Sequence, residues 1–200
     1  FSEETEKVFR ELWLYVGRAV QAAETGYYFT AEIEYESLIA LRGDDGELQV
    51  FYNHCRHRGT LLATESAGHC GRHLTCPYHA WSYSLDGQLR RAPLIENRND
   101  FDRKNCRLPT FSSEIWGGFI YVNLDGTAPP LSPQLEGLSA LIQPYHMDDM
   151  VELHTEESIW ETNWKCLIEN FMEGYHLSTV HRKTLHPITP TRLCSHFPAG

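Results

Sequence analysis

The sequence predicts an α+β protein in which an antiparallel β region precedes a helical region. Two observations lead to this prediction. Short apolar runs between about Tyr28 and Asp125 are separated or ended by three Asp-Gly pairs, a strong signal of tight hairpins. Further along, apolar residues recur at i, i+4, i+7, i+8 and i+11 from Trp160 to Tyr175, the spacing of an amphipathic helix.

The first element, residues 1–18, is predicted to be a helix. Its acidic residues cluster early, where the positive end of a helix dipole favours them. Its apolar residues fall on one stripe: Val8, Phe9, Leu12, Trp13 and Val16.

The β region follows from the Asp-Gly pairs. "SLIALRG" and "ELQVFYN" flank Asp45-Gly46, and "AWSYSL" and "QLRR" flank Asp86-Gly87. "GGFIYVNL" runs into Asp125-Gly126, and the proline-rich "GTAPPLSP" then indicates a turn or linker. Three such signals predict a compact antiparallel β domain.

The last part of the chain is predicted to be a strand leading into a long helix. The segment is "VELHTEESIWETNWKCLIENFMEGYHLSTVH", and Pro187 stops any continuation of the helix. No signal peptide is visible, and no apolar run is long enough to span a bilayer. We predict a cytoplasmic protein, and the abrupt ends of the sequence indicate a fragment of a longer chain.

Composition limits the class of partner. The chain has 200 residues, 42% of them hydrophobic, and a formal net charge of −10. This charge argues against nucleic acid or an anionic membrane as the main partner, and it suits a cationic ligand or a redox partner with a basic docking face. The six cysteines are expected to be reduced in a cytosol, so those near histidines are interpreted first as metal ligands.

Two short motifs are candidates for one metal centre. Cys55-x-His57 ends one apolar run and Cys76-x₂-His79 begins another, so two hairpin loops can converge on one point. Structural zinc favours Cys-x₂₋₄-Cys or His-x₃₋₅-His pairs, whereas each pair here mixes a thiolate with an imidazole. Mixed ligation is typical of a Rieske [2Fe–2S] centre, whose neutral imidazoles raise the potential to about −150 to +300 mV. A zinc knuckle or a chance cluster near turns remains the alternative.

The two loops also resemble a known family. "CRHRGT" and "CPYHAWSYSLDGQL" closely resemble the cluster-binding loops of Rieske oxygenases. The resemblance implies that Cys55 and Cys76 bind one iron and that His57 and His79 bind the other.

The remaining cysteines and nearby histidines are predicted to lie outside this centre. His69, Cys70 and His73 fall between the two loops, in a polar segment that neither motif includes. Cys106, Cys166 and Cys194 are interpreted as structural or incidental, with Cys166 packed within a helix.

A second candidate centre lies at the end of the predicted helix. Asn170, Glu173 and His176 form a polar stripe that lacks the Lys and Arg of an ordinary solvated face, which indicates the wall of a polar cavity. His176 and His181 are five residues apart, about 140° on a regular helix, so the helix must end or distort between them to bring both to one metal. Ordinary polar or packed histidines are the alternative.

This segment carries the second resemblance. "NFMEGYHLSTVH" is similar to the Asn-x-x-[Asp/Glu]-x-Tyr-His-x₄-His signature of the α (catalytic) subunits of Rieske non-haem iron oxygenases. The resemblance implies that His176 and His181 bind a mononuclear iron in a 2-His-1-carboxylate triad, whose carboxylate is expected beyond Gly200. Asn170 would lie near the iron, and Tyr175 is expected to pack with the apolar stripe.

Glu173 stands where the family more commonly has Asp. In the family this carboxylate bridges the iron-site histidine to a Rieske histidine of a neighbouring subunit, here His176 to His79. Members that oxidise carnitine or related quaternary ammonium compounds also carry Glu, which favours a small N-methylated cation as substrate. The alternative is that Glu173 belongs to a solvated helix face.

The resemblance covers nearly the whole chain and implies its organisation. Residues 1–27 would be a helical segment packing with the catalytic domain, 28–128 the antiparallel β Rieske domain, and 129–200 the start of a helix-grip (START-like) catalytic domain.

The implied activity is that of the oxygenase of a multicomponent system. It would use O₂ and electrons from NAD(P)H, delivered by a reductase or ferredoxin, to hydroxylate or demethylate an aromatic or quaternary ammonium compound. The expected assembly is a head-to-tail homotrimer, either with or without additional β subunits. A Rieske electron-transfer protein without oxygenase activity and a zinc-binding interaction module are the competing hypotheses.

Overall fold

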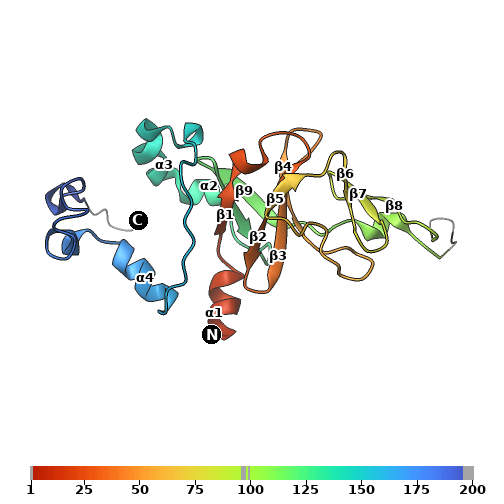
Figure 1. The fold of residues 1–200 in the computed structure, drawn as a ribbon, viewed down its shortest axis with the longest axis horizontal. Coiled ribbons are helices and arrows are strands. Elements are labelled where there is room, and N and C mark those ends of the chain that lie inside the picture. The colour runs from red at the N-terminus through yellow and green to blue at the C-terminus, as the bar shows by residue number, and fades with distance from the viewer. Residues whose placement is uncertain (1, 96–97, 99, 196–200) are drawn as a thin grey trace. The chain divides into compact units, whose positions relative to one another are not determined.

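The computed structural model describes residues 2–95, 98 and 100–195 and divides the chain into two units, Phe1–Val151 and Glu152–Gly200. The first unit holds three antiparallel sheets (Figure 1). In sheet order, these are β1 (Leu14–Arg18), β10 (Phe119–Asn123) and β9 (Ser112–Trp116); β4 (Leu48–Tyr52), β3 (Glu36–Arg42), β2 (Tyr27–Ile33) and β5 (Ala67–His69); and β6 (His73–Thr75), β7 (Ser82–Ser84) and β8 (Leu89–Arg91).

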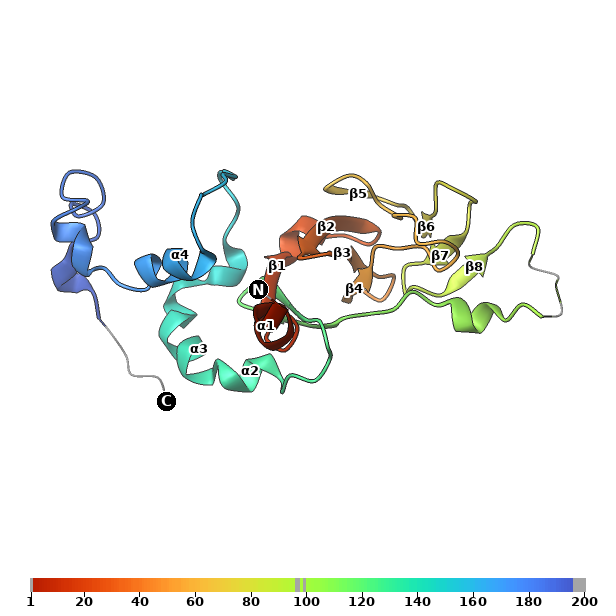
Figure 2. The ribbon, with the colours of Figure 1, turned by 90° about the horizontal axis from the view of Figure 1, so that it is seen from below.

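Strand β3 separates two hydrophobic cores. Side chains alternate across a strand, so successive residues of β3 enter different cores. Leu38 and Ala40 pack in one core with β10, whereas Ile39 and Leu41 pack in the other with the residues around the ligand loops. Both views place the β6–β7–β8 sheet beyond β4, on the side away from β1 (Figures 1 and 2).

Two of the three predicted Asp-Gly hairpins are confirmed. Asp45-Gly46 joins β3 to β4 and Asp86-Gly87 joins β7 to β8, with both glycines at positive φ. At Gly87 an added Cβ would lie 2.6 Å from the Phe51 ring, so the turn needs glycine for space as well as for conformation.

The third Asp-Gly pair does not form a hairpin. The hairpin of β9 and β10 turns instead at Gly117-Gly118, where both residues have positive φ, as a tight two-residue turn requires. After β10 the Asp125 carboxylate accepts hydrogen bonds from the amide and hydroxyl of Thr127. This local turn directs the chain into helices rather than into another strand.

The predicted N-terminal helix is wrong beyond its first half. Helical turns cover only α1 (Ser2–Glu4) and the π-helix η1 (Thr5–Phe9), and Leu14–Arg18 is a strand paired with β10. The buried Asn123 Nδ2 donates to the carbonyls of Arg10 and Glu11, each at 3.0 Å. A long-range side chain thus binds carbonyls that the next helical turn would otherwise use.

Short helices complete the first unit. They are η2 (Ala19–Ala22), η3 (Arg103–Cys106), α2 (Leu131–Gln134), α3 (Glu136–Ile142), η4 (Gln143–Tyr145) and η5 (Met147–Asp149). The predicted turn or linker at "GTAPPLSP" covers only residues 126–130, because its last three residues already belong to α2. In the described part of the chain, no helix has the length and apolar character needed to cross a membrane.

The second unit differs from its prediction in two respects. The predicted strand before the helix is absent from residues 152–160, because these find no partner strand among the described residues. The helix itself, α4, runs only over Trp164–Phe171, and η6 (Tyr175–Ser178) and η7 (Thr191–Leu193) follow. Cys166 is exposed rather than packed.

Glu173 explains why α4 ends early. Its carboxylate accepts hydrogen bonds from the backbone amides of Tyr175 and His176. These amides would donate to carbonyls of the preceding turn if the helix continued. Phe171 and Tyr175, expected on a packed stripe, are accordingly 73% and 83% exposed.

Candidate functional site

The two predicted ligand loops have the same backbone hydrogen bonding. The Cys55 amide donates to Thr60 O, five residues on, and the Cys76 amide donates to Trp81 O, also five residues on. In each loop the fourth residue after the cysteine, Gly59 or Ala80, donates back to the cysteine carbonyl and has positive φ. Ala80 is a non-glycine residue in the left-handed region, an uncommon conformation that the loop must stabilise.

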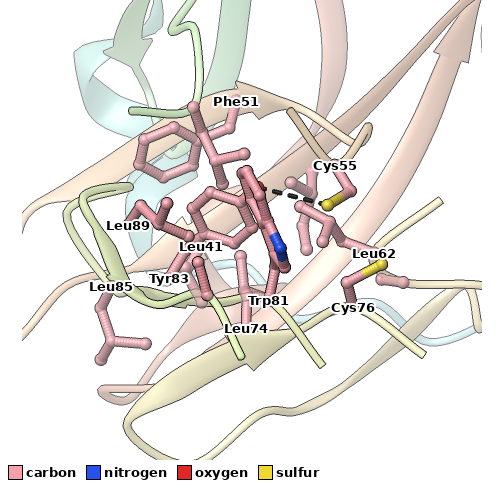
Figure 3. Packing of buried hydrophobic residues seen from close by; sticks show 14 residues of the cluster. Leu41, Phe51, Cys55, Leu62, Leu74, Cys76, Trp81, Tyr83, Leu85 and Leu89 are labelled. Atoms are coloured by element: carbon pink, nitrogen blue, oxygen red, sulfur yellow. Dashed lines mark hydrogen bonds between the residues drawn. The ribbon is translucent and has the colours of Figure 1, made fainter. Parts of the chain in front are cut away.

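The loops bring the four predicted ligands together. Cys55 and Cys76 are only 3% and 2% exposed, and Figure 3 shows both sulfurs on the same side of Trp81. His57 and His79 lie next to each other, with ring centroids 4.7 Å apart. His57 is half-buried and His79 is exposed, so the thiols lie inside and the imidazoles lie toward the surface.

The chemistry of these side chains fits a metal cluster. Both cysteines are free thiols. Burial raises the pKa of the Cys55 thiol, and the neighbouring Cys76 raises it further, so two thiolates are unfavourable there without a cation. Burial and the nearby His79 lower the pKa of His57, which favours the neutral imidazole that binds metal.

Two side chains around Cys55 and His57 were not predicted as site residues. The Trp81 ring stacks on His57, with centroids 4.9 Å apart at 11°. The Tyr83 hydroxyl lies 3.3 Å from Cys55 Sγ (Figure 3). It also accepts a 3.0 Å hydrogen bond from the Arg56 amide. Burial raises the pKa of Tyr83, so its hydroxyl keeps a proton to donate to the sulfur. Trp81 and Tyr83 both lie within "CPYHAWSYSLDGQL", the second loop motif, and that motif is the sequence signal that could have found them.

Tyr83→Phe is expected to lower the reduction potential of a bound cluster by about 40 to 60 mV. A hydrogen bond to a ligand sulfur stabilises the more negative reduced state, and losing about 1 kcal/mol corresponds to this shift for one electron. An EPR-monitored redox titration measures it. Tyr121→Phe, which removes a hydroxyl from β10, serves as the control. An unchanged potential in Tyr83→Phe would show that the hydroxyl does not act on the sulfur.

Asn53 closes the first ligand loop. Its side chain is buried, donating to Ala63 O at 2.7 Å and accepting from the Ala63 amide at 2.9 Å. A further hydrogen bond reaches Ser37 Oγ at 3.3 Å. These contacts hold the two ends of the loop that carries Cys55 and His57.

Asn53→Ala is therefore expected to lower the free energy of unfolding by about 2 to 4 kcal/mol, because it leaves buried polar groups of Ala63 without partners. Urea unfolding measures the loss. Asn105→Ala, at an exposed side chain with one hydrogen bond, to Asp102, is expected to cost less than about 1 kcal/mol. Equal stability of the two variants would contradict this role of Asn53.

The other histidines and cysteines of this region lie elsewhere. His69 ends β5, Cys70 follows it, and His73 begins β6. The His69 and Tyr27 ring centroids lie 4.7 Å apart, and Cys70 Sγ donates to Gly26 O at 3.4 Å. Within the described residues, no three His, Cys, Asp or Glu side chains surround a single metal position. The two loops offer two cysteines and two histidines, the two-plus-two set that a binuclear cluster uses.

The second pair of histidines also comes together. Their ring centroids lie 5.4 Å apart. The α-helix ends before both residues rather than between them, and His176 lies in η6 while His181 lies in the following turn. The Glu173 carboxylate contacts His176 Nδ1, and this hydrogen bond holds the pKa of Glu173 below its usual range.

A cavity of about 790 Å³ lies against these residues. Its polar lining includes Asn170, Glu173, His176 and His181, so all four residues predicted for the second centre share one cavity. The remaining lining is largely apolar and includes Trp160, Phe171, Leu177 and Leu185. Cys194 also lines it, a residue that was interpreted as incidental.

Comparison with known proteins identifies the family. Residues 12–112 match the Rieske [2Fe-2S] domain, and residues 146–198 match the catalytic domain of ring hydroxylating alpha subunits. The chain belongs to the Rieske non-haem iron oxygenases. The predicted family and the predicted α+β fold class are thereby confirmed, and the Rieske match spans both ligand loops.

Several oxygenase subunits are similar to this chain along most of its length. It is 35% identical to the glycine betaine monooxygenase oxygenase subunit of Chromohalobacter salexigens, over 94% of this chain and 42% of that protein. It is 35% identical to the carnitine monooxygenase oxygenase subunit of Escherichia coli (strain K12), over 90% of this chain and 49% of that protein. The chain thus spans about half the length of these relatives.

Solved structures agree with this assignment. The apo crystal structure of the quaternary ammonium Rieske monooxygenase CntA superposes with a TM-score of 0.84 at 31% identity, covering 91% of this chain and 53% of CntA. The crystal structure of naphthalene 1,2-dioxygenase F352V bound to phenanthrene superposes with a TM-score of 0.79 at 28% identity, covering 92% of this chain and 43% of the dioxygenase chain. The Rieske oxygenase fold is therefore shared by relatives that act on chemically different substrates.

Proposed function

We propose that this Rieske oxygenase is the oxygenase component of a multicomponent system that oxidises a small quaternary ammonium or N-methylated compound. O₂ is the co-substrate, and electrons come from NAD(P)H through a reductase or ferredoxin. The observation that carries the proposal is the joint placement of His176, His181 and Glu173 on one cavity, in a chain that also carries the Rieske ligand loops. A pure electron carrier needs no such second centre.

The donor sets assign the metals. Cys55 and Cys76 would hold one iron of the [2Fe–2S] cluster, His57 and His79 the other, and His176 and His181 the mononuclear iron. When bound, the cluster supplies single electrons and the mononuclear iron supplies open positions for O₂. The stacking of Trp81 on His57 and the Tyr83 hydroxyl beside Cys55 support an oriented set of ligands.

Glu173 orients the second centre. Because its carboxylate holds His176 Nδ1, Nε2 of that ring remains as the nitrogen for metal binding. We propose that Glu173 also reaches His79 of a neighbouring copy, whose ring is exposed at its own loop. A head-to-tail homotrimer supplies such a neighbour to every subunit.

The cavity and the relatives favour a cationic substrate. Aromatic rings at Trp160 and Phe171 and the carboxylate of Glu173 attract an N-methylated cation better than a neutral aromatic compound. Two relatives are named as the oxygenase subunits of glycine betaine monooxygenase and carnitine monooxygenase, which agrees with this preference.

We assign residues 1–27 to a segment that packs with the catalytic domain, 28–128 to the Rieske domain and 129–200 to the start of the catalytic domain, in a cytoplasmic protein.

Oxygen uptake by the full-length, iron-loaded protein tests the proposal. With a reductase and NADH, uptake is expected to rise on addition of glycine betaine or L-carnitine and to stay at background with naphthalene. Iron analysis is expected to give three irons per chain. Two irons per chain in fully loaded protein would instead support an electron carrier, and uptake stimulated only by naphthalene would overturn the substrate class.

A further inference from the structure

Charge is distributed unevenly along this chain. Between His54 and Arg107, the segment that carries both ligand loops, nine Lys and Arg stand against five Asp and Glu, a local net charge of +4 in a chain of −10. The acidic excess therefore belongs to the rest of the molecule. The segment that carries the ligand loops is basic, opposite in sign to the chain as a whole.

Four exposed cations form what we term the basic patch: Arg56, Arg103, Lys104 and Arg107. Three belong to η3 or follow it directly. Arg56 joins them across the fold, because it lines the same depression as Pro109, two residues after Arg107.

The guanidinium groups of Arg103 and Arg107 are held by backbone carbonyls, and the nearby carboxylates are Asp102, the N-cap of η3, and Asp86, whose pKa the charge of Arg107 helps to lower. Arg103 Nη1 donates to the carbonyl of Arg90 at 2.9 Å, and Arg107 Nη2 donates to the carbonyl of Asp86 at 2.6 Å. Among the residues that the structure describes, no cation of the patch forms an ion pair with a carboxylate. Four cations against two nearby carboxylates leave this surface with a net positive charge.

A depression of about 500 Å³ connects the patch to a cluster ligand. Cys55 lines it together with Arg56, and Tyr52, His54 and Pro109 are among the other lining residues. Arg56 thus belongs both to the basic patch and to the depression. A protein seated on the patch would approach the cluster from the Cys55 side, whereas the exposed His79 lies on the other loop.

We propose that the basic patch docks the electron-donor protein through an acidic face of that donor, and that electrons enter the cluster from the Cys55 side. This inference rests on the proposed function. One electron leaves the reduced centre of the donor, which is oxidised, and reduces the cluster by one electron, with no group transferred. Opposite charges speed the encounter and orient the donor over the depression. His79 then stays available to a neighbouring subunit.

Binding of an acidic [2Fe–2S] ferredoxin to the full-length, cluster-loaded protein tests the docking site. Arg103→Glu/Lys104→Glu is expected to raise the Kd about tenfold or more at 50 mM NaCl, and the difference should shrink at 300 mM as salt screens the charges. Arg72→Glu, at an exposed residue of the β5–β6 connection, is the matched control for Lys104→Glu, because both variants replace one cation with one carboxylate. Lys104→Glu alone, at an exposed side chain, repeats the test with minimal disturbance.

Three results would overturn the docking site. They are failure of the wild-type protein to bind the ferredoxin at low salt, an equal effect of Arg72→Glu, and a changed oligomeric state in the double variant, which would assign the patch to a contact between copies. Reduced methyl viologen, a small cation, should reduce the cluster equally in every variant. If wild-type protein that is reduced in this way does not oxidise glycine betaine or L-carnitine, the proposed function is contradicted instead. Failure of the docking site and failure of the proposed function are therefore distinguishable.

Discussion

His79→Cys is expected to abolish the Rieske EPR signal of the full-length protein. A thiolate in place of a neutral imidazole makes the cluster more negative, which should lower its potential by about 200 mV or more, toward the roughly −400 mV of all-thiolate ferredoxins. If the variant instead loses iron from the cluster, the Rieske EPR signal is abolished as well. EPR of the dithionite-reduced protein, together with iron and sulfide analysis, measures both.

His73→Cys is the matched control for this prediction. It makes the same chemical change six residues earlier, at an exposed histidine on β6 that the structure places outside the ligand loops. Its spectrum and potential should equal those of the wild-type protein. A normal Rieske signal in His79→Cys, or a lost signal in His73→Cys, would show that the ligand assignment is wrong.

Glu173→Gln is expected to leave both metal centres occupied and to lower kcat by about 100-fold, the upper range for loss of a side chain that orients a metal ligand. The amide keeps the size of the side chain but removes the charge that holds His176 Nδ1 and that would hold His79 of a neighbouring copy. Steady-state oxygen uptake measures kcat. Stopped-flow reoxidation of the reduced cluster shows whether electron transfer to the iron is the slowed step.

Glu169→Gln provides the comparison, because Glu169 is exposed on α4 and is absent from the lining of the cavity. Its kcat should stay within about twofold of the wild-type value, as for ordinary surface changes. If Glu173→Gln turns over at a near-normal rate with three irons bound, the bridging role is refuted. If it loses the mononuclear iron, Glu173 serves metal binding rather than electron transfer.

Local sequence was sufficient for features whose parts lie within a few residues of one another. The turns at Asp45-Gly46 and Asp86-Gly87 depend on a left-handed glycine between two strands, so a short window contains the whole signal. The pairs Cys55/His57 and Cys76/His79 are recognisable for the same reason. The resemblance of two loop motifs to those of a known family was enough to name the family, and comparison with known proteins confirms it.

Predictions failed where a side chain took over a hydrogen bond of the helical backbone. The first helix ends early because Asn123, more than one hundred residues away, binds the carbonyls of residues 10 and 11. The apolar stripe predicted a longer α4, but the carboxylate of Glu173 takes the amides of the next turn. Hydrophobic periodicity carries no information about such side-chain competition for backbone groups.

The sequence by itself determined the family, the fold class and the residue types of both candidate centres, because short motifs contain both the ligand residue types and their spacing. Only the tertiary structure decided that two loops some twenty residues apart adopt the same backbone arrangement, that Tyr83 reaches the sulfur of Cys55, and that Arg56 shares a depression with Pro109, which lies shortly after η3. These features depend on how β4, β7 and η3 pack around a shared core, and packing joins residues whose separation in the chain carries no periodic signal.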